Sequence, residues 1–403
     1  RGRRRADFDD VEQRASRDGV EPFGHGVARA VREPGPVVAA HQAIGVPTIS
    51  RMTVNATILV ASATASRRPT NIDFSVAHTP LVWVARFWLA GAAVGGGICA
   101  VPGVPAVPVG IPQSVVDFVA TVPRLGDPKK IVSSTTRITT DPIGLQIAKY
   151  AASVIEATGY VKDGFSFQTG TGGISLAVAS HVRDMLRKNK VKGSFGCGGI
   201  TGFFVDMLEE GLFEALFDVQ CFDLKAVESI GRNQRHVEMT AGTYANPFNC
   251  GAVVNRLDCA ILSATEIDVN FNVNVNTESM GYLLHNTGGH CDVAAGAKVS
   301  IVVCPSIRGR LPMIRDEVTT ITTPGETVGV IVTERGVAVN DKLPELKAEL
   351  IRRRVPVKDI RQLRDEIYAV TGVPKPIEFE DDVVGLIEYR DGSIIDVVRK
   401  VRQ

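Results

Sequence analysis

The 403-residue sequence has no excess of positive or negative charge. Forty-five Lys and Arg residues are matched by 44 Asp and Glu residues, which leaves a formal net charge of +1. A protein without a bulk positive charge has no electrostatic reason to bind nucleic acid or an anionic membrane. We therefore expect neither as a partner.

Cysteine motifs are also absent. The seven cysteines are scattered, and none forms a Cys-x-x-Cys pair. His285 and His290 do not match a His-x-x-x-His ligand spacing, and no acid stands at a helical ligand spacing from them. This pattern indicates reduced thiols in a cytoplasmic protein, and it argues against a disulfide framework or a metal site.

A convincing targeting or membrane segment is missing as well. The arginines of residues 1–5 are followed at once by acidic residues, which transit peptides avoid. Residues 81–100 are apolar, but Arg86 and the glycine run 95–97 favour a buried or irregular segment over a membrane span.

From residue 113 onward, short apolar runs alternate with segments of helical periodicity. Asp141-Pro142 is a strong helix start, and Gly159 marks its end. Strands are expected near residues 114–120, 165–168, 216–221, 259–267, 299–304 and 328–333, and helices near 142–158, 174–188, 204–208, 343–353 and 358–370. A hairpin is expected around Asp391-Gly392. This alternation predicts a largely parallel sheet covered by helices on both faces.

Glu266 stands at the mouth of the predicted buried strand 259–267. Loss of hydration there would raise the basicity of the carboxylate and favour a role as nucleophile, although isolated acids are more often solvated or paired. Behind it, alternate residues are asparagines, which predicts a half-buried edge strand with one amide face: Asn270, Asn272, Asn274 and Asn276.

Two short glycine-rich turns, which we call glycine corners, lie beside predicted strands. The first follows the strand at 165–168, and the second precedes the strand at 299–304. Gly170, Thr171, Gly172 and Gly173 open a helix, where backbone N–H groups and the helix N-terminus favour an anion. Ser175 replaces the third glycine of a Rossmann loop, and no P-loop Lys follows, so a plain tight turn is the alternative.

The second corner, Gly288-Gly289, precedes the strand at 299–304, with His290 an incidental neighbour. Three arginines, Arg308, Arg310 and Arg315, either receive a carboxylate or phosphate or form a solvated loop. Both corners and Glu266 fall at strand ends of one predicted parallel sheet, where ligands bind.

Seven ordered stretches of the chain match a known family. From about residue 115 to the end, the chain resembles the citrate lyase alpha chains, the citrate CoA-transferase subunits, and more distantly the acetate and hydroxybutyrate CoA-transferases. The stretches are residues 126–132, 136–139, 162–170, 172–179, 276–281, 288–293 and 332–336.

The resemblance implies exchange of acetyl for citryl on the thiol of an acyl-carrier protein, with release of acetate. It implies Glu266 as the nucleophile that forms a glutamyl thioester, with Glu278 as the competing carboxylate. The amides of Gly170–Gly173 and Gly288-Gly289 would bind the oxyanion. The implied partners are a lyase beta subunit and an acyl-carrier gamma subunit, whose CoA-like prosthetic thiol is the only cofactor; this chain itself would bind none.

The predicted fold class is therefore α/β, with tandem open, mostly parallel sheets of the CoA-transferase kind and an atypical first half. Residues 1–125 are predicted to be a degenerate or divergent first half, and residues 126–403 the domain with the catalytic glutamate. The Arg-, Ala- and Pro-rich texture of the first half suits a shifted reading frame, a hypothesis that the nucleotide sequence would test. Alternatives are a general acetate or acyl-CoA transferase and an inactive scaffold subunit of the lyase complex.

Overall fold

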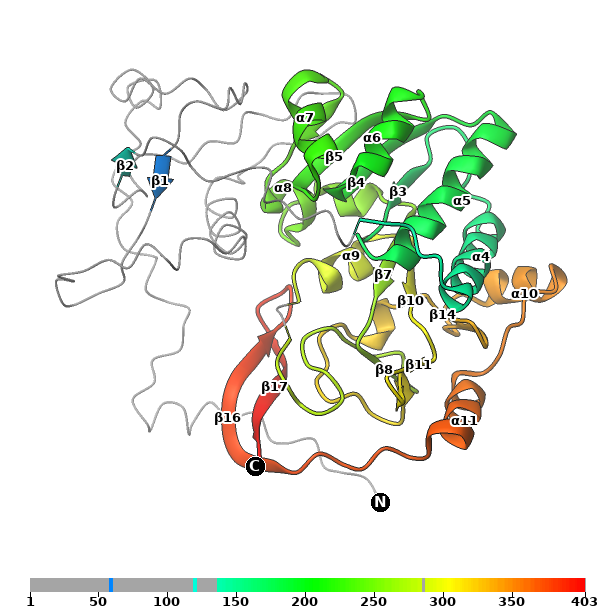
Figure 1. Cartoon of the computed structure of the whole chain (residues 1–403), viewed down its shortest axis with the longest axis vertical. Helices are drawn as coiled ribbons and strands as arrows, with labels where there is room; N and C mark the ends of the chain where they lie inside the picture. Colours follow the sequence, from blue (N-terminus) through cyan, green and yellow to red (C-terminus); the bar gives the residue numbers. More distant parts are fainter. Residues whose placement is uncertain (1–57, 61–118, 122–135, 285–286, 403) are drawn as a thin grey trace.

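In the computed structural model, the described residues are 58–60, 119–121, 136–284 and 287–402. The first two segments are the short antiparallel strands β1 (Ile58–Val60) and β2 (Val119–Thr121) (Figure 1). The apolar segment 81–100, most of the predicted first half and His285 lie outside the described residues. No helix in the described ranges is long and apolar enough to cross a membrane.

The main sheet has eight strands, and every neighbouring pair is parallel except β14 and β15. The prediction of a largely parallel sheet is confirmed. In spatial order the strands are β15 (Gly336–Val339), β14 (Val330–Thr333), β10 (Val299–Val303), β7 (Cys259–Ser263), β3 (Ser166–Gln168), β4 (Gly193–Ile200), β5 (Phe213–Cys221) and β6 (His236–Glu238).

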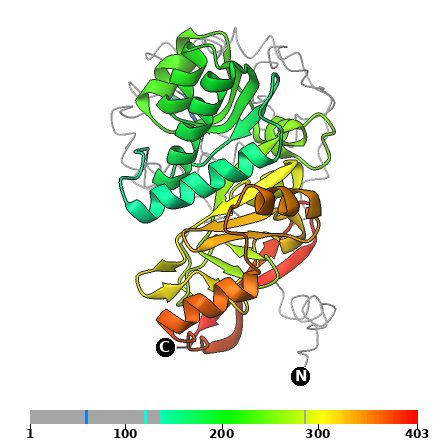
Figure 2. The ribbon, with the colours of Figure 1, turned by 90° about the vertical axis from the view of Figure 1, so that its right-hand side faces the viewer.

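Helices cover both faces of this sheet, and Figure 2 shows α4 crossing the front with α10 below it. Local signals set their ends: Asp141 caps α4 by accepting the amide of Gly144 at 3.0 Å, with Pro142 at the first helical position. The helices are α4 (Pro142–Ala157), α5 (Gly173–Asn189), α6 (Gly202–Glu209), α7 (Leu224–Arg232), α8 (Ala241–Ala245), α9 (His290–Gly296), α10 (Pro344–Arg352) and α11 (Ile360–Thr371), with 3-10 turns at Val253–Arg256 and Gly325–Thr327.

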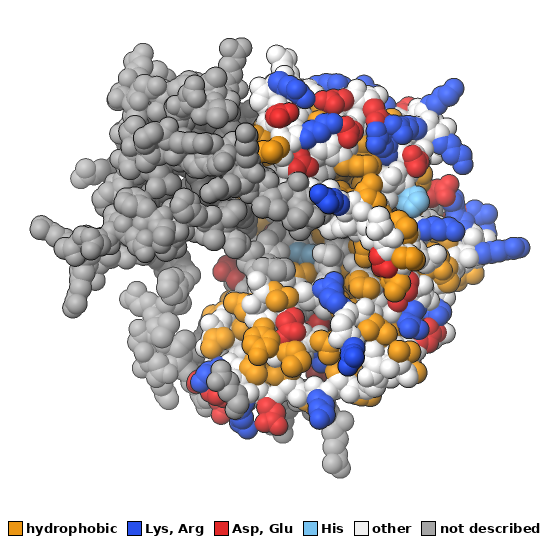
Figure 3. All heavy atoms as spheres, in the orientation of Figure 1, with side chains coloured by type: hydrophobic (Ala, Val, Ile, Leu, Met, Phe, Trp, Pro, Cys, Tyr) orange, Lys and Arg blue, Asp and Glu red, His pale blue; other side chains and the backbone are white. Residues whose placement is uncertain are grey.

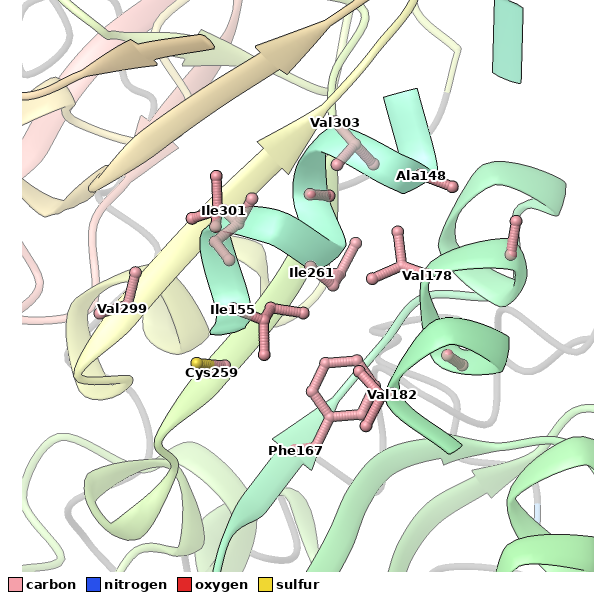
Figure 4. Close-up of a cluster of buried hydrophobic side chains, with 14 of the residues drawn as sticks. Ala148, Ile155, Phe167, Val178, Val182, Cys259, Ile261, Val299, Ile301 and Val303 are labelled. Atoms are coloured by element: carbon pink, nitrogen blue, oxygen red, sulfur yellow. The ribbon is translucent and has the colours of Figure 1, made fainter. Parts of the chain in front are cut away.

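Side chains of the central strands point alternately to the two faces of the main sheet, so each face has its own hydrophobic core. Ile261 and Ile301 point to the side of α4 and α5, where they meet Phe167 (Figure 4). Their neighbours Ala260 and Val302 point to the opposite side, against α9 and α11. Because the strands are apolar on both faces, the sheet is buried on both sides, as parallel sheets require.

A three-stranded sheet follows the end of β7 and corrects two predictions. The expected strand 259–267 is split: β7 ends at Ser263, and Glu266 begins β8 (Glu266–Asp268), the middle strand between β13 (Ile314–Arg315) and β9 (Val273–Asn274). The chain bends between them because the amide and hydroxyl of Thr265 both donate to Asn274 O, at 2.9 and 2.7 Å.

The asparagine segment is a turn and not a strand over most of its length. The Asp268 carboxylate accepts the amides of Asn270 and Asn272 at 2.8 and 3.0 Å, and Phe271 is left-handed with φ 67°. Only Val273–Asn274 pair as a strand. Period-2 alternation misleads here because the side chain of Asp268 competes for the backbone amides.

Two hairpins complete the described structure. The short pair β11 (Ile307–Arg308) and β12 (Leu311–Pro312) follows β10. The predicted C-terminal hairpin is confirmed and longer than expected, with strands β16 (Phe379–Glu388) and β17 (Ile394–Val401). Exposed apolar side chains gather over this hairpin and the adjacent turn in Figure 3, among them Tyr282, Leu283, Val384 and Leu386.

Candidate active site

Glu266 is fully buried, with 0% of its surface exposed, at the start of the middle strand β8. Its Oε1 accepts the Arg315 guanidinium and the Thr319 hydroxyl, the latter at 3.1 Å. Its Oε2 accepts the Thr319 amide at 2.7 Å and the Asn274 amide group at 3.0 Å. Each carboxylate oxygen therefore has two donors, as a buried charge needs.

A second set of hydrogen bonds holds Asn274 in this orientation. Its Nδ2 also donates to Thr277 Oγ1 at 2.9 Å, and Thr277 Oγ1 donates to Thr320 Oγ1 at 3.2 Å. Its Oδ1 accepts the amides of Asn276 and Thr277 at 3.0 and 3.1 Å. Of the four predicted amides, Asn274 is the one that bonds to Glu266, while the side chain of Asn272 bonds to Asp268.

The first glycine corner emerges beside the end of β7. Gln168, the last residue of β3, pairs with Ala260 in register, so residues 169–173 leave the sheet beside the second half of β7. Gly172 is the N-cap of α5 and makes no side-chain cap bond. Among the described residues, the amides of Gly170, Thr171 and Gly172 have no hydrogen-bond acceptor. They are available as backbone donors to a ligand.

The second corner is tied to the same place by His290. Gly288 is left-handed with φ 53°, and Gly289 is the N-cap of α9. The His290 Nε2–H donates to Ser263 O at 2.9 Å, so Nδ1 accepts the Thr323 hydroxyl at 2.7 Å. Burial lowers the pKa of His290 to about 4, which keeps the ring neutral at pH 7. His290 is a tether between the corner and the small sheet, a role that sequence reasoning missed.

Tyr244 joins the two corners, and no sequence pattern singled it out. Its ring covers Gly289, where an added Cβ would lie 3.2 Å from Cε1. Burial raises the pKa of Tyr244 well above 10, and the nearby Gln168 side chain partly offsets this rise. The structure thus brings both corners to the end of β7. No hydrogen bond among the described residues links either corner to the Glu266 carboxylate.

The predicted arginine cluster separates into two groups. Arg315 is buried against Glu266, whereas Arg308 and Arg310 are exposed on the β11–β12 hairpin. Glu278 is a half-buried turn acid whose Oε1 accepts the amides of Met280 and Tyr282 at 2.8 and 3.3 Å.

Two buried cysteines are protonated thiols, and the described ranges contain no cluster of metal ligands. Burial raises the pKa of Cys291 to about 11 and that of Cys304 to about 12, so neither is a thiolate at neutral pH. No group of three His, Cys, Asp or Glu side chains in those ranges is placed to hold a metal ion.

Comparisons with known proteins agree with this architecture. The family model of the citrate lyase alpha subunit matches residues 99–401. The chain belongs to the citrate lyase alpha subunit family. The resemblance found in the motifs is confirmed.

Individual relatives are similarly close. The citrate lyase alpha chain of Haemophilus influenzae is 48% identical over 295 residues, covering 73% of this chain and 59% of that protein. The Escherichia coli citrate lyase alpha chain is 48% identical over 296 residues, covering 73% and 58%. A Streptococcus mutans structure described as an alpha subunit of citrate lyase in complex with citrate aligns with TM-score 0.70 and 48% identity, covering 74% of this chain and 59% of that one. The chain thus spans just under three fifths of the length of these relatives.

Proposed function

We propose that this chain is a citrate CoA-transferase that converts an acetyl thioester and citrate into a citryl thioester and acetate. The family match over residues 99–401 carries the proposal, and the similar Streptococcus mutans structure contains citrate. The thiol belongs to the CoA-like group of an acyl-carrier gamma subunit, and a lyase beta subunit completes the complex. We place this work in the cytoplasm.

In the direct route, a citrate carboxylate attacks the acetyl thioester carbonyl. The C–S bond breaks, which gives an acetyl-citryl anhydride and a free thiolate; the thiolate then attacks the citryl carbonyl and acetate leaves. Both steps pass through an oxyanion. The unpartnered amides of Gly170, Thr171 and Gly172, at the N-terminus of the 17-residue helix α5, are suited to stabilise it.

In the covalent route, Glu266 attacks the acetyl thioester carbonyl and the C–S bond breaks, which gives an acetyl-glutamyl anhydride and a free thiolate. The thiolate attacks the glutamyl carbonyl and acetate leaves, which gives a glutamyl thioester. Citrate then attacks this thioester to give a citryl-glutamyl anhydride and a thiolate, and the thiolate attacks the citryl carbonyl and releases Glu266. The geometry supports this route less well. Glu266 would first have to leave Arg315, Thr319 and Asn274, and a carboxylate with two donors on each oxygen is a weak nucleophile. The nucleophilic role of Glu266 stays a prediction, and the direct route is the one we favour.

Borohydride trapping separates the two routes. The full chain is incubated with acetyl-CoA, reduced with borohydride and mapped by mass spectrometry. The direct route predicts no mass change on Glu266 while acyl exchange proceeds. A reduced Glu266 side chain in the wild type, absent from Glu266→Gln and present in the matched control variant Glu278→Gln, would establish the covalent route instead.

The acid specificity tests the alternatives. A citrate CoA-transferase should exchange citrate far faster than other carboxylic acids, whereas a general acyl-CoA transferase would accept them comparably. A folded chain that exchanges no acyl group with any acid, yet binds the lyase subunits, would be a scaffold subunit.

A further inference from the structure

Three loops leave the main sheet side by side at its carboxyl edge. Ser263 of β7 pairs with Val303 of β10, and Val303 pairs with Val332 of β14. The segments that follow are residues 264–266, 304–310 and 334–335. Figure 1 shows β8 and β11, which belong to the first two of these continuations, next to each other below β7 and β10. Ligands of parallel sheets bind at this edge.

Two of the three arginines in these loops have no carboxylate partner in the described part of the chain. Glu334 is engaged by Ser306, whose amide donates to it at 2.9 Å and whose hydroxyl bonds its other oxygen. Arg335 lies 3.8 Å from Glu334 and donates to Ser306 Oγ at 3.0 Å. Arg308 and Arg310 have no carboxylate within ion-pair distance among the described residues.

The backbone holds these two arginines in a constrained turn. Gly309 and Arg310 form the two-residue connection of the β11–β12 hairpin, with φ of 54° and 77°. Two-residue hairpin turns favour positive φ at both central positions, and a left-handed residue other than glycine costs roughly 1 kcal/mol there. Arg308 reaches back so that its Nη2 lies 3.5 Å from Ala264 O, on the chain that leads to Glu266. Both arginines are exposed residues.

We propose that Arg308 and Arg310 recognise a small polycarboxylate, with Arg335 as a third cation at the rim. Each guanidinium can hold one carboxylate through two parallel hydrogen bonds. A di- or tricarboxylate therefore engages two arginines at once, while a monocarboxylate such as acetate engages one. This inference rests on the proposed function, because it names the side chains that receive citrate and release acetate.

Calorimetric titration of the full chain tests the site without any assay of activity. Citrate and acetate are titrated into the wild type, Arg308→Gln, Arg310→Gln and the double variant. The control is Arg354→Gln, since Arg354 is also exposed and left-handed, with φ 60°, but its side chain forms no hydrogen bond or ion pair with the three loops. Circular dichroism melting verifies that each variant is folded.

Each single variant should weaken citrate binding by roughly tenfold to a hundredfold, the usual effect of losing a charge-assisted contact. Acetate binding should change by less than about threefold, and the control should match the wild type. The site is disproved if the folded double variant binds citrate within about threefold of the wild type, or if the wild type binds no citrate.

Thioester exchange, measured separately, distinguishes the two proposals. A wild type that binds citrate through these arginines but exchanges no acyl group would leave the recognition site standing and overturn the proposed function. Normal exchange with an unchanged citrate KM in the double variant would overturn the site and leave the function.

Discussion

Replacement of Glu266 by glutamine is the most informative change in the small sheet. The side-chain volume stays nearly the same, so the effect reports on charge and on hydrogen bonds. Arg315 is only 9% exposed beside it. Removing the carboxylate leaves this guanidinium buried and without its counter-charge, which costs about 3–5 kcal/mol.

Neither orientation of the glutamine amide restores the network. An NH2 group at the Oε1 position faces Arg315 and the Thr319 hydroxyl, and at the Oε2 position it faces the Thr319 amide and Asn274. Asn274 cannot turn over to accept, because its oxygen already holds the amides of Asn276 and Thr277. The Thr319 hydroxyl can rotate to accept, but the Arg315 guanidinium and the Thr319 amide can only donate. In either orientation, therefore, at least one donor meets a donor.

Urea unfolding at pH 7 measures the loss. We expect Glu266→Gln to lower the free energy of unfolding by about 3–5 kcal/mol. Glu278→Gln should lower it by less than about 0.5 kcal/mol, because Glu278 has no buried counter-charge and the glutamine oxygen can still accept the turn amides. The double variant Glu266→Gln/Arg315→Met should recover much of the loss, with a coupling energy of about 2 kcal/mol or more. A loss below about 1 kcal/mol for the single variant, with additive effects in the double variant, would refute the role of Glu266 as the buried partner of Arg315.

Three further predictions concern other parts of the described structure. Because the pKa of His290 is lowered to about 4 from 6.5, the unfolded chain binds the extra proton, and the free energy of unfolding should fall as pH drops from about 6.5 to about 4, by at most about 3 kcal/mol. Unfolding titrations at pH 5 and 7 should show a smaller difference in His290→Gln; an equal difference would contradict the assignment. Exposed Cys250 should react with iodoacetamide before Cys304, whose pKa burial raises to about 12; labelling of both at one rate, read by mass spectrometry, would be inconsistent with the burial. Gly325→Ala should lower the free energy of unfolding, measured in urea, by about 2 kcal/mol or more, since the added Cβ would lie 2.0 Å from Asn270 O. An unchanged unfolding midpoint would show that the turn at Asn270 moves to accommodate the methyl group without cost.

The main sheet and its helices were largely predictable because their signals are local. Asp141-Pro142 caps α4 as expected. The apolar runs at 299–304 and 328–333 contain β10 and β14. These signals depend on residues a few positions apart, so the sequence displays them directly. The apolar run at 165–168 likewise contains β3, and the first glycine corner follows the end of this strand as expected.

The split of the expected strand 259–267 lay beyond such reasoning. The apolar run 259–262 is followed by the polar residues Ser263, Thr265 and Glu266, but no glycine or proline marks a break before Ile267. The partners that draw Glu266 into a second sheet are Ile314–Arg315 of β13 and Val273–Asn274 of β9. Strand pairing is a property of residues that meet after folding, so a single-segment pattern cannot assign it.

By itself, the sequence determined the fold class, the family and the placement of a carboxylate just past a buried strand. Only the tertiary structure decided the state of that carboxylate. Its partners Arg315 and Thr319 stand 49 and 53 residues away in the chain, and they surround Glu266 only when β13 pairs with β8. Whether an acid is a free nucleophile or a neutralised structural charge depends on which donors reach it, and long-range packing alone brings those donors together.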